Sequence, residues 1–381
     1  MDIIPNFILS ELEKYLSQSQ LLTLQILIWL LQVHKDVKIE RLAACLPLPI
    51  LYESRRKHLK RFLVLKKLSV TLIWLPIIKA VLDNSLARGS KIVIVLDRTQ
   101  WKNNNLLMVS VVWKKRALPV YWNFLNKKGS TNINEKIAIL KPVIKLLNHF
   151  QIVVIGDREF GCVEFAYWLK RQKIRFALRV KQGTNIRKRG GKYQTMDELG
   201  LKPGLKIFYS HINYTKKKGF GEFNLAAYWK RKYKGKVDKE GWFILTNLEN
   251  INEVIKIFKQ RSGIEAMFKD CKTGGYNLEG SRAKIERLTR LVLLIAIAYT
   301  MMVLQGKLIK NQGQQKYIAR LKENKRNGKR HSNFWVGLYG YNWIITWEFC
   351  YSLVNLIMKI NSHKSPYYQQ GMKAMDLIKK A

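Results

Sequence analysis

Two unbroken aliphatic runs, each followed by an aspartate, constrain the fold of this chain more than any other feature. Residues 91–97 read KIVIVLD, and residues 152–157 read IVVIGD. A continuous aliphatic run is typical of a strand that is buried on both faces, because no alternate position carries a polar side chain for solvent. The two runs therefore predict a sheet that is covered on both sides.

The segments around these runs predict the rest of the sheet. Aliphatic runs at 106–113 and 117–124 follow the first strand after short turns, which indicates a meander of three strands. Helical patterns at 134–149 and 163–172 flank the second aliphatic strand, and a further strand is predicted at 175–180. The order three strands, helix, strand, helix, strand predicts a mixed α/β sheet with helices packed on it.

The flanking segments predict a division of the chain into five parts. Helical periodicity dominates both ends, whereas glycine, lysine and aromatic residues alternate with short β-prone runs before residue 249. We expect a helical domain at 1–85, the first part of the core at 86–180, a β-rich insertion at 181–249, completion of the core at 250–305, and a helical basic region at 306–381.

The charge of the chain indicates a polyanionic partner. Lys and Arg number 69 against 26 Asp and Glu, which leaves a formal net charge of +43. A positive surplus of this size is self-repelling, and nucleic acid is the commonest polyanion that compensates it. A ribosome-associated or membrane-surface protein is the alternative that charge alone leaves open.

Cysteine usage and the apolar segments favour a cytoplasmic protein. The four cysteines lie far apart without a CxxC pair, which argues against a zinc site and against a disulfide framework. Segment 15–33 carries four glutamines, and segment 291–305 is shorter than the roughly 20 residues of a membrane helix. No signal peptide pattern begins the sequence, so we expect no membrane partner.

A basic helix is predicted near residues 52–65, after a shorter helix and a break that contains two prolines. It carries Arg55, Arg56 and Lys60 among other cations. This arrangement resembles a helix-turn-helix DNA reader. The alternative is a solvated basic face on an ordinary helical bundle, and the sequence does not decide between the two.

Asp97 and Asp157 stand where two carboxylates can meet. Each directly follows an aliphatic strand, and reactive groups in open α/β sheets collect at the carboxyl ends of strands. Two bare carboxylates at one place repel unless a divalent metal neutralises them, and oxygen-only ligation selects Mg²⁺ or Mn²⁺. Alternatively, each aspartate merely caps the following turn, as aspartate does well.

A third carboxylate, Glu265, lies in the helical segment FKQRSGIEAMFKDCK. Four residues of this segment stand at offsets 0, 3, 7 and 14, namely Phe258, Arg261, Glu265 and Lys272. At roughly 100° per residue these offsets fall within a narrow sector of one helix face, and Lys269 lies beside it. Arg261 and Glu265 have the alternative of an ordinary i,i+4 ion pair on a surface stripe.

The spacing of this segment resembles the signature Y-x2-R-x3-E-x6-K of DDE transposases of the insertion-sequence-four (IS-4) family. Arg261, Glu265 and Lys272 match the signature, and Phe258 stands in the place of its tyrosine. The stretches LDRTQW and GDREF, which contain the two aspartates, and the β-rich insertion before Glu265 are also similar to that family. The resemblance covers roughly residues 85–305 and implies a ribonuclease-H-like catalytic core.

The resemblance also implies a mechanism. Asp97, Asp157 and Glu265 would hold two Mg²⁺ ions, with Mn²⁺ as a substitute, one at the attacking oxygen and one at the leaving oxygen. Water would cut at the transposon end, and the released 3′-hydroxyl would attack flanking or target DNA. The implied partners are double-stranded DNA and, in the DNA complex, a second copy of the chain; no small-molecule cofactor is expected.

Several residues are expected to contact DNA by the same resemblance. Arg261 and Lys272 would clamp a phosphate near the cut, with Lys269 as a helper and Phe258 supplying a ring without the phosphate-bonding hydroxyl. Trp242 begins the run WFILT, which resembles the stretch that carries a base-stacking tryptophan in relatives that cut through a hairpin. Alternatively, Trp242 is a core residue at the start of a strand.

A basic segment at 321–331 is followed by Phe334, Trp335 and Tyr339, which suits either nucleic-acid contact or a solvated face. For the whole chain, a DNA transposase is the first hypothesis. A metal-dependent endonuclease of the same fold and a catalytically silent DNA-binding descendant are the alternatives.

Overall fold

The protein is described by a computed structural model that covers residues 4–216, 221–233, 235, 238–321 and 331–380. Its chain forms two units. One unit consists of Met1–Pro76 together with Lys269–Ala381, and the other consists of Ile77–Phe268. Within the described residues the first unit is helical, whereas the second is built on a sheet.

Apolar helices form the core of the first unit. α10 (Ile285–Asn311) packs against α2 (Gln18–His34) and α12 (Asn333–Phe349), and most residues of α10 are buried. A helix that is apolar nearly all round must be covered by its neighbours. The remaining helices of this unit, with short turns of other helical types included, are α1 (Asn6–Glu13), α3 (Ile39–Cys45), α4 (Tyr52–Phe62), Val70–Trp74, Leu278–Gly280, α11 (Gln315–Ile318), α13 (Tyr351–Ile360), Ser362–Lys364 and α14 (Ser365–Lys379).

Among the helices in the described part of the chain, α10 has the length and apolar composition to cross a membrane. It is longer than the uncharged stretch 291–305, which alone is too short to cross a membrane, because helix-forming polar residues extend it at both ends. Of its most apolar stretch, 83% is buried inside the structure. This burial is the property of a core helix.

A ten-stranded sheet runs through the second unit in the order β3-β2-β1-β4-β5-β10-β9-β8-β6-β7. Strands β1 and β4 are parallel, as are β4 and β5, and every other neighbouring pair in this sheet is antiparallel. The strands are β1 (Lys91–Trp101), β2 (Asn104–Trp113), β3 (Arg116–Phe124), β4 (Gln151–Gly156), β5 (Arg175–Arg179), β6 (Asn185–Arg187), β7 (Tyr193–Thr195), β8 (Lys206–Tyr214), β9 (Glu222–Tyr228) and β10 (Trp242–Thr246).

The first five strands confirm the predicted fold class. The meander β1–β2–β3 is followed by α6 (Ile133–Leu146), β4, α7 (Val163–Arg171) and β5, which is the order expected of the ribonuclease-H-like core. Residues 92–96 of β1 and 152–156 of β4 are all buried, as their unbroken aliphatic sequences predict. This α/β sheet is the scaffold of the site described below.

The β-rich segment that follows extends the same sheet instead of forming a layer of its own. β10 pairs with β5 along Ile244↔Arg179 and Thr246↔Ala177, and β9, β8, β6 and β7 continue outward from it. The insertion predicted at 181–249 is therefore joined to the core by strand pairing.

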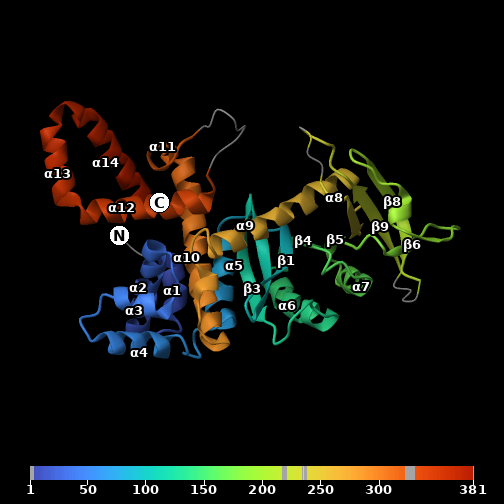
Figure 1. The fold of residues 1–381 in the computed structure, drawn as a ribbon, viewed down its shortest axis with the longest axis horizontal. Helices are drawn as coiled ribbons and strands as arrows, with labels where there is room; N and C mark the ends of the chain where they lie inside the picture. Colours follow the sequence, from blue (N-terminus) through green and yellow to red (C-terminus); the bar gives the residue numbers. More distant parts are fainter. Residues whose placement is uncertain (1–3, 217–220, 234, 236–237, 322–330, 381) are drawn as a thin grey trace. The chain divides into compact units, whose positions relative to one another are not determined.

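Helices pack on the strands of this unit (Figure 1). α6 contacts β2 and β3, and α7 contacts β5. α8 (Ile251–Phe258) contacts β5, β8 and β9, so it spans the junction between the core strands and the insertion. α5 (Leu75–Asp83), a short turn at Asp197–Leu199, a 3₁₀ turn at Lys259–Arg261 and α9 (Ser262–Cys271) complete the helical segments of this part of the chain.

Candidate active site

The register of two parallel strands brings Asp97 and Asp157 to one edge of the sheet. The last aligned pair between β1 and β4 is Leu96↔Gly156, and each aspartate is the next residue along its strand direction. One expectation needs correction, because β1 does not end at Asp97. It continues to Trp101, since β2 remains paired with it as far as Trp101↔Asn104. The parallel pairing of β1 with β4 therefore ends at Leu96, whereas the antiparallel pairing of β1 with β2 continues to Trp101.

A tight turn holds Asp157 at the end of β4. Its side-chain Oδ1 accepts the backbone N–H of Arg158 at 2.7 Å, and its carbonyl accepts the N–H of Phe160 at 2.7 Å. Gly161 then passes so close to β5 that a Cβ atom would lie 1.7 Å from the carbonyl oxygen of Arg179. Only glycine fits this approach, so Gly161 fixes the turn that carries Asp157.

Glu265 comes from α9, and the helix that carries it is not the continuous one we expected. The segment divides into α8, a 3₁₀ turn at Lys259–Arg261, and α9, so residues 258–272 do not share one helix face. Ser262 and Gly263 at the break are weak helix formers. At the other end, Gly274 donates its N–H to the carbonyl of Lys269, a helix-ending contact that leaves Lys272 beyond α9.

One guanidinium contacts all three carboxylates. Arg261 Nη2 lies 2.7 Å from Glu265 Oε1, and Arg261 Nη1 lies 3.8 Å from Asp97 Oδ2 and 3.7 Å from Asp157 Oδ2. The i,i+4 ion pair considered from the sequence is therefore present, and two further carboxylates join it. We call Asp97, Asp157, Glu265 and Arg261 the acidic cluster.

The acidic cluster brings three carboxylates together around one guanidinium. Burial raises the pKa of Asp97 to about 6, against the lowering effect of the Arg98 N–H and of Arg261, and the neighbouring Asp157 and Glu265 raise it further. A carboxyl group with such a pKa is costly to ionise, and an added cation lowers that cost. The side chain of Asp97 is 19% exposed, whereas that of Glu265 is 53% exposed, so the cluster opens to solvent on the Glu265 side.

The chemistry of the donor set fits an oxygen-preferring divalent cation. All three candidate ligands are carboxylates, the groups that Mg²⁺ takes from proteins. Within the described residues, no three His, Cys, Asp or Glu side chains are gathered as ligands around one point. The guanidinium of Arg261 lies among the three carboxylates instead, in the place where a cation is needed.

Arg179 and Glu240 are part of the site, and the sequence reading missed both. Arg179 Nη1 lies 3.7 Å from Asp157 Oδ1, and its Nη2 donates to Glu240 Oε1 at 2.7 Å. Glu240 also pairs with Arg158 at 3.1 Å. Arg179 ends β5, next to β4, and its position two strands from Asp97 follows from the parallel order once that order is known.

Phe258 is buried and Trp242 is half-buried, and the two rings pack on each other. Phe258 is only 2% exposed, and its ring packs edge-to-face on Trp242 with ring centroids 5.1 Å apart. The DNA contact expected of Phe258 is corrected accordingly, because the ring offers no surface to a phosphate. Trp242 is half-buried at the start of β10 and also packs on Tyr228, and its base stacking stays a prediction.

Lys269 and Lys272, the two lysines expected to contact phosphate, belong to the other unit. Lys269 is exposed on the last turn of α9. Lys272 lies 2.6 Å from Glu279, and its side chain is 18% exposed. The phosphate contacts expected of Lys269 and Lys272 stay predictions.

The basic helix forms as predicted, as α4, but its cations differ in their contacts within the protein. Arg55 donates to the carbonyl of Leu46 at 3.2 Å, and Arg56 pairs with Glu53 at 3.3 Å and approaches Glu40. These contacts tie Arg55 to the end of the preceding helix α3, and Arg56 to both α3 and α4. Lys60 is half-buried on α4. In the basic segment 321–331, residues 322–330 lie outside the described residues.

Comparison with known proteins gives one family match. The family described as Transposase DDE domain matches residues 88–301, which is more than half of the 381 residues. No curated protein matches the sequence.

Two solved structures resemble parts of the chain. One is a piggyBac transposase in a synaptic complex with hairpin DNA, with 13% identity and a TM-score of 0.41 over 89% of this chain and 76% of that chain. The other is the Argonaute of Marinitoga piezophila with a 5′ OH guide RNA, with 14% identity and a TM-score of 0.24 over 58% of this chain and 34% of that chain. Neither likeness is close enough to assign a function. The matched residues 88–301 span the core strands, the insertion and the acidic cluster, and the chain belongs to the Transposase DDE domain family.

Proposed function

We propose that this chain is a transposase of the IS-4 type that mobilises a bacterial insertion sequence. It would bind the terminal inverted repeats, cut the DNA at the transposon ends, and join the freed 3′ ends to a target. The observation that carries this proposal is the meeting of Asp97, Asp157 and Glu265 around one guanidinium at the edge of the core sheet.

Asp97, Asp157 and Glu265 are the proposed ligands of two Mg²⁺ ions, for which Mn²⁺ can substitute. When bound, such ions activate the attacking oxygen and stabilise the leaving oxygen of an in-line displacement. The protein contributes the rigid edge on which the ligands stand: Asp97 lies inside a paired strand, and Asp157 lies on a turn locked by Gly161. This placement keeps two ligands at fixed positions while DNA enters and leaves.

The chemistry proceeds in two displacements at phosphorus. Water forms a bond to the phosphorus at the transposon end, the bond to the 3′ oxygen breaks, and the 3′-hydroxyl leaves with a proton from solvent. That hydroxyl then attacks a second phosphodiester and releases another 3′-hydroxyl. No bond between protein and DNA is needed, so positioning and charge neutralisation supply the catalysis.

Arg261 has two proposed partners in this cycle. In the structure its guanidinium contacts the three carboxylates, and its planar fork equally suits a phosphate of the cleaved strand. Lys269 and Lys272 are proposed as further phosphate contacts. Truncation of Arg261 to alanine is expected to weaken end binding or strand transfer.

The remaining parts of the proposal concern partners. The net charge of +43 suits double-stranded DNA, both at the transposon ends and in the target. The helical segment 1–85, with Lys60 on α4, is the proposed end-binding part, and a homodimer on DNA would hold two ends together. We place this activity in the cytoplasm, where bacterial DNA is accessible.

Three substitutions test the proposal. Asp97→Asn, Asp157→Asn and Glu265→Gln keep the side-chain shape and remove the charge. Each should lower Mg²⁺-dependent cleavage of end DNA at least about a thousandfold, or about 4 kcal/mol in the barrier, while DNA binding is retained. Asp83→Asn is the control, because Asp83 is an acid of the same unit whose ion pair with Lys79 lies outside the acidic cluster. Normal cleavage by any of the three variants would refute the assignment.

A further inference from the structure

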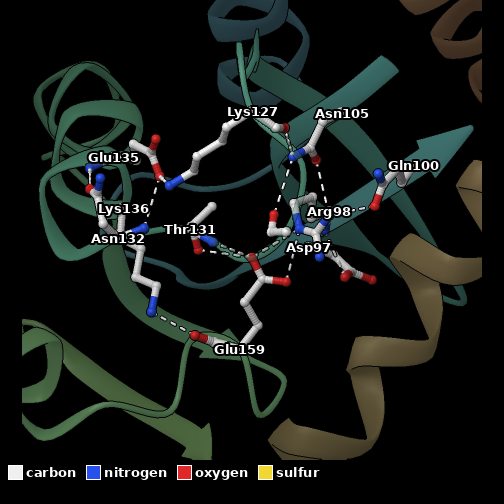
Figure 2. A network of polar contacts seen from close by, with 11 residues as sticks. Asp97, Arg98, Gln100, Asn105, Lys127, Thr131, Asn132, Glu135, Lys136 and Glu159 are labelled. Atoms are coloured by element: carbon white, nitrogen blue, oxygen red, sulfur yellow. Dashed lines mark hydrogen bonds and ion pairs between the residues drawn. The ribbon is translucent and has the colours of Figure 1, made fainter. Parts of the chain in front are cut away.

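A second group of charged residues lies directly behind the acidic cluster, and its members are not among the proposed ligands. Arg98 Nε donates to both carboxylate oxygens of Glu159, at 3.0 and 2.9 Å. Figure 2 shows the two side chains pointing toward each other. Both are largely withdrawn from solvent, with 17% and 19% of their side chains exposed, so this ion pair is shielded from water and salt more than a surface pair is.

The pair connects the two chain segments that carry the aspartates. Arg98 follows Asp97 in β1, and Glu159 lies two residues after Asp157 in the turn that ends β4. Successive side chains of a strand point to opposite faces of the sheet, so Arg98 leaves β1 on the face away from Asp97. Arg98 and Asp97 are linked through the backbone, and the backbone N–H of Arg98 donates to Asp97 Oδ1 at 2.8 Å.

Glu159 is held by more than Arg98. Its Oε1 also accepts the backbone N–H and the hydroxyl of Thr131, both at 2.9 Å. Its backbone carbonyl accepts Lys136 Nζ at 2.5 Å, and Lys136, in the second turn of α6, is 4% exposed. The turn after Asp157 is thus tied to the start of α6.

Arg98 is likewise fixed on its other side. Its Nη1 donates to Asn105 Oδ1 at 3.0 Å, and Asn105 Nδ2 donates to the carbonyls of Lys127 and Gly129 at 2.8 and 3.2 Å (Figure 2). The strand β1, the turn after β4 and the loop before α6 are therefore cross-linked through one pair of charges. We call Arg98, Glu159, Thr131, Lys136 and Asn105 the clamp.

We propose that the Arg98–Glu159 pair is a positioning device that sets the spacing between Asp97 and Asp157, and thereby the affinity of the acidic cluster for divalent metal. This inference rests on the proposed function. The geometry supports it because the pair spans the two segments whose separation defines the ligand spacing, and because each partner is bonded on further sides to rigid elements. Residues that orient metal ligands without binding the metal themselves commonly change metal affinity by about 10- to 100-fold when they are removed.

The test separates positioning from mere support of the fold. The variants are Glu159→Gln, which keeps the contacts to Thr131 and removes the charge, and Arg98→Gln. The matched control is Lys91→Ala, which breaks an ion pair with Glu253 at the opposite end of β1. For each protein we would measure Mg²⁺ binding by calorimetry without DNA, the Mg²⁺ concentration at half-maximal cleavage, and the unfolding temperature.

The expected result is an approximately tenfold or larger weakening of Mg²⁺ binding in both clamp variants, with an equal shift of the half-maximal Mg²⁺ concentration. Saturating Mg²⁺ should restore most of the cleavage rate, and Lys91→Ala should bind Mg²⁺ as the unmodified protein does. A double variant should lose no more than either single one, because the pair acts as a unit.

Two results would overturn the inference. Unchanged Mg²⁺ binding in folded clamp variants would remove the positioning role. A weakening that only follows the unfolding temperature, with the Lys91→Ala control affected in proportion, would reduce the clamp to general support. Failure of the unmodified protein to bind Mg²⁺ or cut DNA would instead count against the proposed function itself.

Discussion

Two groups of charged side chains stand on opposite faces of β1, and they are balanced differently. In the acidic cluster three carboxylates share Arg261, at distances from 2.7 to 3.8 Å. In the clamp one carboxylate, that of Glu159, receives Arg98 at 2.9 Å and two hydrogen bonds from Thr131. The single carboxylate of Glu159 has its own guanidinium, whereas the three carboxylates of the acidic cluster share Arg261, with Arg179 3.7 Å from Asp157, and an added cation can relieve their repulsion. Carboxylates that share one cation, next to a fully paired carboxylate, are the arrangement expected of a metal-binding site and of the residues that hold its ligands in place.

The largest expected effect on stability comes from opening the clamp. Glu159→Ala leaves the guanidinium of Arg98 without its partner in a largely buried position, so the free energy of unfolding should fall by about 3 kcal/mol. Lys91→Ala breaks a more exposed pair of the same strand and should cost less than about 1 kcal/mol. Denaturant unfolding of the two variants measures this contrast, and equal losses would contradict it.

A smaller effect should come from filling the acidic cluster. Mg²⁺ at a hundredfold excess over its Kd should raise the free energy of unfolding by about 2.7 kcal/mol, since the ion binds only the folded state. Glu265→Gln should remove most of this gain, and removal of the metal with a chelator should reverse it in the unmodified protein. The measurement is thermal unfolding across a Mg²⁺ titration. A gain of the same size in Glu265→Gln would show that the ion binds elsewhere.

The smallest effect concerns the charge of Asp97 in the absence of metal. Burial raises the pKa of this carboxyl from 3.8 to about 6. A raised carboxyl pKa favours the folded state while the group is protonated, so its contribution is present below about pH 4 and is lost as the pH rises through about 6. Asp97→Asn should therefore stabilise the metal-free protein by about 1 to 2 kcal/mol at neutral pH, and by much less near pH 4.

The control for this pH dependence is Asp83→Asn: against burial, which raises the pKa of Asp83, the hydrogen bonds from Lys79 and His149 hold it below its usual value. Its substitution should lower stability at neutral pH instead of raising it. Urea unfolding in chelator at the two pH values measures both variants. Destabilisation by Asp97→Asn at neutral pH would mean that its contact with Arg261 outweighs the cost of burial.

The sheet could be predicted from the sequence because its central strands β1 and β4 have unbroken aliphatic sequences. Residues 92–96 and 152–156 are buried throughout, and the alternation of strands with helices fixes their neighbours. Asp97 and Asp157 follow from the same pattern, because two parallel strands in register place the next residues side by side.

The other features of the candidate site depend on contacts that sequence spacing does not reveal. Arg179 meets Glu240, which lies 61 positions further along the chain, and this contact requires the pairing of β5 with β10. The spacing of residues 258–272 predicted one continuous helix. The 3₁₀ turn at Lys259–Arg261 interrupts it, and Phe258, just before this turn, is buried in the core. Arg98 and Glu159 sit beside the two aspartates in sequence, but only the folded structure shows that they are bonded to each other.

Strand transfer in vitro is the decisive measurement for the function. A supercoiled donor that carries the terminal repeats is incubated with the protein, Mg²⁺ and a target plasmid, and the products are sequenced. We expect 3′ ends of the donor element covalently joined to target DNA with the unmodified protein, and no joining with Asp157→Asn. Cleaved ends that are never joined would contradict a transposase and indicate a nuclease, and joining by Asp157→Asn would contradict the acidic cluster as its active site.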